Sequence, residues 1–219
     1  MAYNNIHHLI GRGFFDYKIL IINKMLTKLE IKRQLIHILL GIVIVLLLFF
    51  DLINAVILFI TFIIGIILSL LSRRINIPII YRLLEIFDRK KDLETFPGKG
   101  MIFYILGAFI VVSIFPKEIA MASIMILALG DSVSRLIGPY GYLKHPFHNE
   151  KFFEGVIAGS IAGFLGALIF VPWALALAGS LVSMLIEGIE LRIKSFKIDD
   201  NLLIPIVAAV VMEAVNVLV

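Results

Sequence analysis

The chain has 219 residues; 61% of them are hydrophobic, only 16% are charged, and the mean hydropathy is +1.05. Because a soluble domain is usually about 45–50% apolar and about 25% charged, this composition excludes an ordinary soluble domain and indicates an integral membrane protein. The absence of cysteine excludes disulfides, thiolate zinc sites and cysteine nucleophiles. The net charge of +4 is modest, and we expect the bilayer, not nucleic acid, to be the large partner.

The first 29 residues are predicted to form an amphipathic helix, separate from a membrane-embedded domain over residues 30–219. Apolar residues such as Ile6, Ile10, Phe14 and Tyr17 recur at helical spacing, and charged residues fall mostly on other faces. This pattern favours a helix lying in the membrane interface. The alternative is a helix that packs on the cytoplasmic side of the protein itself.

Seven apolar runs follow, which predicts an all-α, polytopic membrane helix bundle. The expected spans are residues 34–50, 52–71, 101–115, 119–136, 156–171, 174–186 and 202–219. Several are near the lower limit of about 17 residues for a crossing. The long polar segments all connect spans at one predicted face, and the turns at the other face have only a few residues.

The basic residues predict which face is cytoplasmic. In this topology every lysine and arginine except Lys117 lies on the side that carries the long polar segments. Cytoplasmic loops are enriched in Lys and Arg. We therefore expect a multi-pass protein whose motif-bearing loops, and hence its active site, face the cytoplasm, where nucleotides are available.

The segment 129–155, LGDSVSRLIGPYGYLKHPFHNEKFFEG, interrupts two of these runs. Asp131 is predicted near the cytoplasmic end of the fourth span, where a charged side chain is costly and is a candidate for function. Arg135 follows one helical turn later and could pair with it. The functional interpretation of Asp131 is a magnesium ligand, since Mg²⁺ is held by one or two carboxylates with phosphate oxygens and water. The alternative is a buried ion pair that only holds two helices together.

The rest of this segment has the composition of a phosphate site. Gly138 and Gly141 can provide tight turns with exposed backbone amides that bind phosphate. Lys151 can contact a phosphate as a point charge, and Glu154, three residues later on the same helical face, can bind a metal or take a proton. Each feature by itself is also compatible with an ordinary turn or a surface salt bridge.

Two further elements have similar composition. Gly98 and Lys99 lie in a basic Pro-Gly-Lys-Gly sequence that a membrane-anchoring role explains poorly. Asp199, Asp200 and Asn201 precede the last span and form either a solvated loop or a second metal-binding cluster.

Other polar residues lack a clear partner. Glu213 and Asn216 fall within the last span and could hold helices or protomers together or line a lipid site. Glycines at three- and four-residue spacing in the fifth span predict close helix packing: Gly155, Gly159, Gly163 and Gly166. These features permit a homodimer. The sequence does not assign roles to His145 or His148.

The whole arrangement resembles the polyprenol kinase family, which includes dolichol kinases, phytol kinases and CTP-dependent diacylglycerol kinases. Four segments carry the resemblance: EIKRQLIHILLG at residues 30–41, PGKGMIFYILG at 97–107, LGDSVSRLIGPYG with NEKFFEG, and DDNLLIP at 199–205. The resemblance implies transfer of a phosphoryl group from CTP to the hydroxyl of a membrane lipid alcohol, with Mg²⁺ or another divalent cation. The chain departs from the family at Arg135, where a small residue is usual, and at Phe152, which follows Lys151.

The resemblance also implies roles for individual residues. Asp131, Lys151 and Glu154 would be catalytic, with Asp131 and Glu154 holding the metal. The nucleotide would contact the remaining motif residues: Gly98, Lys99, Gly130, Gly138, Gly141, Gly155, Asp199, Asp200 and Asn201. The lipid would be of polyprenol or dolichol type, although the sequence selects neither the alcohol nor its chain length.

Two alternatives differ in class. A CTP-dependent cytidylyltransferase acting on a phosphorylated lipid has a similar Gly-Asp and Lys-x-x-Glu-Gly segment, but its second acidic signature comes after that segment, whereas here KDLETFPGKG precedes it. A non-enzymatic transporter or scaffold would place polar residues along several spans, whereas here they gather at one membrane face.

Overall fold

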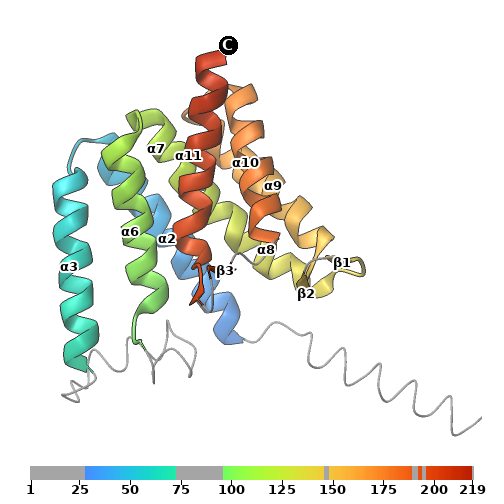
Figure 1. The fold of residues 1–219 in the computed structure, drawn as a ribbon, viewed down its shortest axis with the longest axis horizontal. Helices are drawn as coiled ribbons and strands as arrows, with labels where there is room; N and C mark the ends of the chain where they lie inside the picture. Colours follow the sequence, from blue (N-terminus) through green and yellow to red (C-terminus); the bar gives the residue numbers. More distant parts are fainter. Residues whose placement is uncertain (1–27, 73–95, 146–147, 189–191, 194–195, 219) are drawn as a thin grey trace, which may run out of the picture.

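The computed structural model describes residues 28–72, 96–145, 148–188, 192–193 and 196–218 (Figure 1). Helices make up most of these ranges, which confirms the predicted all-α fold class. The predicted amphipathic helix lies outside the described residues except for its last two positions. The polar segment 73–95 also lies outside them.

Each predicted apolar run forms a helix within a few residues of its expected bounds. The helices are α2 (Lys28–Phe49), α3 (Ala55–Ser72), α6 (Lys99–Ile114), α7 (Lys117–Met125), α8 (Ser132–Ile137), α9 (Phe153–Ala167), α10 (Trp173–Gly188) and α11 (Asp200–Leu218). A π-helical turn, η1 (Ile126–Asp131), makes α7 and α8 continuous. Four helical stretches are long and apolar enough to cross a membrane: Lys28–Phe49, Ala55–Ser72, Lys117–Tyr140 and Asp200–Leu218. Since α6, α9 and α10 are shorter, the count of seven crossings stays a prediction.

Short elements other than α-helices lie within segments predicted as loops. A 3-10 turn, η2 (Gly138–Tyr140), is followed by β1 (Lys144–His145) and β2 (His148–Phe152), which pair antiparallel. A second antiparallel hairpin joins β3 (Arg192–Ile193) to β4 (Phe196–Lys197). Figure 1 places these strands at the end of the bundle where α11 begins, opposite the C-terminus.

The continuous helix through α7, η1 and α8 forms the centre of the bundle. In its most apolar stretch 78% of the residues are buried, against 11% for α3. It contacts α2, α9, α10 and α11, while α3 packs mainly on α6 at the edge of the molecule (Figure 1). The exposed apolar faces of α2 and α3 are what a lipid-facing surface requires, because hydrocarbon solvates such side chains.

The glycine stripe of α9 lets that helix approach the central helix closely. A methyl group at Gly155 would lie 2.8 Å from the Ser134 carbonyl oxygen, and one at Gly159 would lie 2.7 Å from the Gly130 carbonyl oxygen. Gly163 and Gly166 have neighbours equally close. The stripe is therefore used for packing within one chain, as small residues are in membrane bundles.

We expect Gly159→Ala to destabilise the protein by about 2 kcal/mol, because the added methyl group has no room between two backbones. The thermal midpoint in detergent should fall by about 6 °C. Gly65→Ala on α3 is the matched control, since its methyl group would meet only the side chain of Ile102 at 3.3 Å. Equal midpoints for the two variants would contradict the close-packing role of Gly159.

The two ends of the bundle differ chemically. At one end Lys117 forms an ion pair with Asp51 at 2.5 Å and donates to the Phe49 carbonyl oxygen. Asp51 lies in a tight turn with φ of 55°. At the other end lie the first turns of α6 and α11, the last turns of α8 and α10, and the hairpins (Figure 1). Most polar residues singled out by their sequence pattern belong to this second end, whereas Glu213 and Asn216 lie in the C-terminal half of α11.

Candidate active site

Asp131 is the buried centre of a polar network, with only 1% of its side chain exposed. It ends the π-helical turn η1, and such turns are frequent at functional sites because the wider turn displaces the side chains that follow. Arg135 Nε donates to both Asp131 oxygens, at 2.9 and 2.8 Å. The predicted pairing of Asp131 with Arg135 is confirmed.

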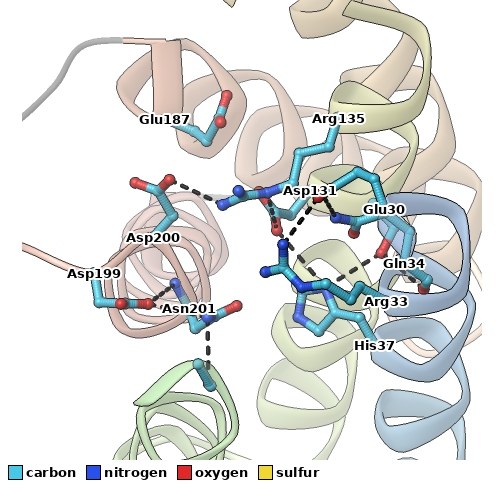
Figure 2. A network of polar contacts seen from close by, with 12 residues as sticks. Glu30, Arg33, Gln34, His37, Asp131, Arg135, Glu187, Asp199, Asp200 and Asn201 are labelled. Atoms are coloured by element: carbon cyan, nitrogen blue, oxygen red, sulfur yellow. Dashed lines mark hydrogen bonds and ion pairs between the residues drawn. The ribbon is translucent and has the colours of Figure 1, made fainter. Parts of the chain in front are cut away.

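Arg135 also connects the central helix to the last helix. Its second guanidinium nitrogen donates to Asp200 Oδ2 at 3.0 Å (Figure 2). Asp200 is the first residue of α11, and it lies 65 positions after Arg135 in the chain. Asp200 therefore belongs to the network around Asp131, whereas Asp199 lies beside Lys99.

Glu187 is a carboxylate of this network that the sequence pattern did not single out. It lies in the last turn of α10 with 2% of its side chain exposed. Lys151, on β2, donates to both the Glu187 side chain and the Glu187 carbonyl oxygen, and lies 3.8 Å from Asp200 Oδ2. A glutamate at the end of an apolar helix is a signal for a functional site, but the charged segment that follows Glu187 led to its assignment to a loop.

Three carboxylates thus converge from three helices. One oxygen each of Asp131, Glu187 and Asp200 lies within 4.8 Å of the other two. Glu187 Oε2 is buried and has no hydrogen-bond partner among the described residues. Oxygen ligands of this kind are those that Mg²⁺ and Ca²⁺ prefer. The cluster carries three potential negative charges against the two cations Arg135 and Lys151, so it could accept a divalent cation.

Helix α2 borders the cluster on another side. His37 Nδ1 lies 3.6 Å from Asp131 Oδ2 and 3.3 Å from Ser132 Oγ. Gln34 and Glu30 continue the network along the same helix, with Gln34 Nε2 donating to Glu30 Oε1 at 2.7 Å (Figure 2). The sequence contained His37 without an identifiable partner; the fold supplies one, nearly one hundred residues away.

The Pro-Gly-Lys-Gly motif and the Asp-Asp-Asn motif meet beside the cluster. Lys99 Nζ lies 3.5 Å from Asp199 Oδ2. Asn201 Nδ2 donates to Asp199 Oδ1 at 3.0 Å and to the Gly100 carbonyl oxygen at 3.2 Å. Burial raises the pKa of the Asp199 carboxyl, and the Lys99 ammonium opposes that shift. Gly98 precedes α6 with φ of 76°, a left-handed conformation that favours glycine.

Glu154 is placed differently from the other predicted site residues. Glu154 Oε1 accepts hydrogen bonds from the backbone amides of Tyr142 at 2.7 Å and Leu143 at 3.1 Å. A methyl group at Gly141 would come 2.5 Å from Glu154 Oε2, so the carboxylate requires glycine there. Glu154 is not part of the carboxylate cluster in the described residues. Its role as a metal ligand stays a prediction.

The remaining glycines of the segment lie at helix contacts. A methyl group at Gly155 would lie 2.9 Å from Gly138 Cα, and one at Gly130 would lie 3.1 Å from Met184 Sδ. These approaches explain Gly130 and Gly155 by packing, whereas a methyl group at Gly138 would make only an ordinary contact, 3.8 Å from Gly155 Cα. Contact of the three glycines with a nucleotide stays a prediction. Glu213 Oε2, far along α11, is buried without a hydrogen-bond partner among the described residues. His145 and His148 are register partners in the first hairpin.

Comparison with known proteins gives relatives that include uncharacterized proteins and lipid kinases. The chain is 32% identical over 191 residues to an uncharacterized protein of Methanocaldococcus jannaschii, covering 86% of this chain and 95% of that one. It is 31% identical over 154 residues to the CTP-dependent diacylglycerol kinase 1 of Saccharomyces cerevisiae, covering 58% of this chain and 51% of the kinase. It is 29% identical over 127 residues to a probable chloroplastic phytol kinase 2 of Oryza sativa, covering 52% and 42% respectively.

The chain thus spans about half the length of the yeast kinase and less of the plant kinase. No family model and no solved structure matches it. The expected resemblance is confirmed by these relatives, and each of the four segments that carry it contributes a residue in or beside the buried network. The chain is therefore a relative of the CTP-dependent diacylglycerol kinases and the phytol kinases.

Proposed function

We propose that this protein is a CTP-dependent kinase that phosphorylates the hydroxyl of a membrane lipid alcohol, of polyprenol or dolichol type, at the cytoplasmic face. The observation that carries the proposal is the convergence of three carboxylates, Arg135 and Lys151 at one end of a bundle of apolar helices. Ionised groups at such a position are costly and are retained for function. The relatives named as CTP-dependent diacylglycerol kinases support CTP as the donor.

The residues of the cluster fit a divalent cation. Asp131, Glu187 and Asp200 would hold it, and the unpartnered Glu187 Oε2 gives the cation an oxygen that no described residue uses. A bound Mg²⁺ would neutralise charge on the phosphates of the nucleotide. In this proposal Glu154 shapes the loop that precedes it and Glu187 takes the place in the metal site that the sequence pattern assigned to Glu154.

The cations would bind the phosphates. Arg135 and Lys151 are held within the cluster by carboxylates, so their positive groups are already positioned where a polyphosphate would need them. Lys99, 31% exposed at the edge of the site, would contact the nucleotide from the aqueous side. Phosphoryl transfer depends chiefly on positioning and charge stabilisation, and Asp131 would orient the acceptor hydroxyl or take its proton.

The cytoplasmic location rests on the placement of the basic residues. Lys117 lies at the end of the bundle opposite the cluster, together with Asp51, while Lys99, Arg135 and Lys151 lie at the cluster. The positive-inside rule then assigns the cluster to the cytoplasm.

Labelled CTP tests the proposal directly. Purified protein in detergent, with Mg²⁺ and a lipid alcohol, should transfer label from γ-labelled CTP to the lipid and none from α-labelled CTP. Polyprenol, phytol, diacylglycerol and phosphatidate are offered side by side. Label from α-labelled CTP in a product of phosphatidate would instead identify a cytidylyltransferase. The absence of a labelled product with all four lipids would contradict the enzyme assignment.

A further inference from the structure

The corner between η2 and β1, residues 141–143, exposes two large side chains at the end of the bundle that carries the carboxylate cluster. The Tyr142 side chain is 84% exposed and the Leu143 side chain is 65% exposed. Exposed apolar side chains that lie next to one another are typical of surfaces that contact another protein or a membrane. The position of this corner on helix α9 indicates which of these partners it contacts.

The first residues of α9 fix the backbone of the corner. Glu154 Oε1 accepts hydrogen bonds from the amides of Tyr142 at 2.7 Å and Leu143 at 3.1 Å. The Leu143 carbonyl oxygen accepts a third hydrogen bond, from the Phe153 amide at 2.9 Å. Figure 1 shows β1 and β2, which follow the corner, beside the start of α9 at the outer edge of the bundle. The two exposed side chains are therefore held at the beginning of this helix.

Glu154 belongs to the exposed face of α9. Residues three, seven and eleven positions after it share its face of the helix. These positions hold large apolar side chains that are each more than half exposed: Ile157, Ile161 and Leu165. The glycine stripe of α9 lies on the opposite face, against the central helix. In a membrane protein, a row of exposed aliphatic side chains opposite the packed face of a helix has the character of a lipid-facing surface.

The corner lies where this apolar row ends. Ile157 comes three residues after Glu154, which is about 4.5 Å along the helix axis. On its other side the corner continues into residues 144–151, KHPFHNEK, which are mostly polar. A position between a lipid-facing row and a polar hairpin corresponds to the boundary between hydrocarbon and water. Tyrosine is enriched at this boundary, because its ring is apolar and its hydroxyl is polar.

We propose that Tyr142 and Leu143 insert into the headgroup region of the bilayer and that Glu154 positions them there. The partner of these two side chains is the lipid surface, and not the nucleotide that the sequence pattern assigned to this glycine-containing segment. The inference gives Glu154 a role other than metal binding. It goes beyond the proposed kinase function and does not depend on it.

Spin labelling tests the lipid contact directly. The chain has no cysteine, so Tyr142→Cys and Leu143→Cys each carry a single label in the full chain. The proteins are placed in phosphatidylcholine vesicles, and electron paramagnetic resonance measures collisions of the label with oxygen, which concentrates in lipid, and with a water-soluble nickel chelate. The same label on α9 provides a scale of depth, through Ile157→Cys, Ile161→Cys and Leu165→Cys.

The labels at Tyr142 and Leu143 should collide more with oxygen and less with nickel than a free spin label in water does. Their values should fall at the shallow end of the series measured along α9. Collision rates equal to those of the free label at both positions would overturn the proposal. If Mg²⁺ and CTP move both labels out of contact with lipid and immobilise them, the corner binds the nucleotide and the proposal also fails.

The positioning role of Glu154 has its own test in the Leu143→Cys protein. Glu154→Ala removes the acceptor of two amides, so the label should become more mobile and its collision rates should move toward those of the free label in water. Glu154→Gln is the matched control, because it keeps an oxygen that can accept from the same amides, and its label should stay in contact with lipid. Thermal midpoints verify that both variants are folded. Unchanged lipid contact in a folded Glu154→Ala variant would refute this role.

Discussion

Asp131→Asn should reduce CTP-dependent phosphorylation of a lipid alcohol at least about 10³-fold, because it removes a buried negative charge at the point where we propose that the metal and the acceptor bind beside Arg135. The substituted side chain keeps its size, and Arg135 keeps its hydrogen bond to Asp200. Arg135 therefore retains one of its two carboxylate partners. Initial rates from γ-labelled CTP measure the effect. Lys151→Ala should cause a comparable loss, because it removes the proposed contact with a phosphate of CTP.

Asp51→Asn is the matched control for this substitution. It makes the same chemical change at the opposite end of the bundle, where the side chain is 83% exposed and pairs with Lys117. Exposed ion pairs contribute about 0–1 kcal/mol, and asparagine tolerates the positive φ of that turn. Activity and thermal midpoint should stay near those of the wild type. An Asp131→Asn enzyme that keeps more than a tenth of the wild-type rate would refute the central role of Asp131.

Glu187→Gln and Glu154→Gln should separate the two glutamates that compete for the metal role. Glu187→Gln should lower the rate about 10²-fold and raise the Mg²⁺ concentration needed for half-maximal activity, because the amide is a weaker metal ligand than the carboxylate. Glu154→Gln should change the Mg²⁺ requirement little, since its remaining oxygen can still accept from the Tyr142 and Leu143 amides. Titration of Mg²⁺ at saturating CTP measures both.

The opposite outcome has a clear meaning. If Glu154→Gln raises the Mg²⁺ requirement and Glu187→Gln does not, the metal is held as the spacing of Asp131, Lys151 and Glu154 suggested. The loop closed by Glu154 would then have to rearrange on binding the nucleotide. Both variants change one atom only, so a loss of folding is not expected to obscure the comparison; the thermal midpoint of each variant checks this.

Local sequence information was sufficient for the helices. Long apolar runs cannot leave backbone groups unpaired in hydrocarbon, so the run lengths predict helices whatever their neighbours are. The glycine spacing of α9 likewise predicted close packing, and the structure puts Gly159 against Gly130. The pairing of Arg135 with Asp131 could be predicted because the two residues are four positions apart, and residues at this spacing share one face of a helix.

The composition of the buried network required the tertiary structure. Helical periodicity predicts which residues share one face of a helix, but it does not predict which other helix contacts that face. Glu187 and Asp200 lie beside Asp131 because α10 and α11 pack against the central helix. Glu154 instead accepts hydrogen bonds from the Tyr142 and Leu143 amides, although it belongs to the same motif as Lys151. The sequence by itself determined a membrane helix bundle with Asp131 near one end, since those features depend on local hydropathy. Only the folded chain decided which carboxylates and which histidine surround Asp131, because contacts between distant segments depend on the packing of whole helices.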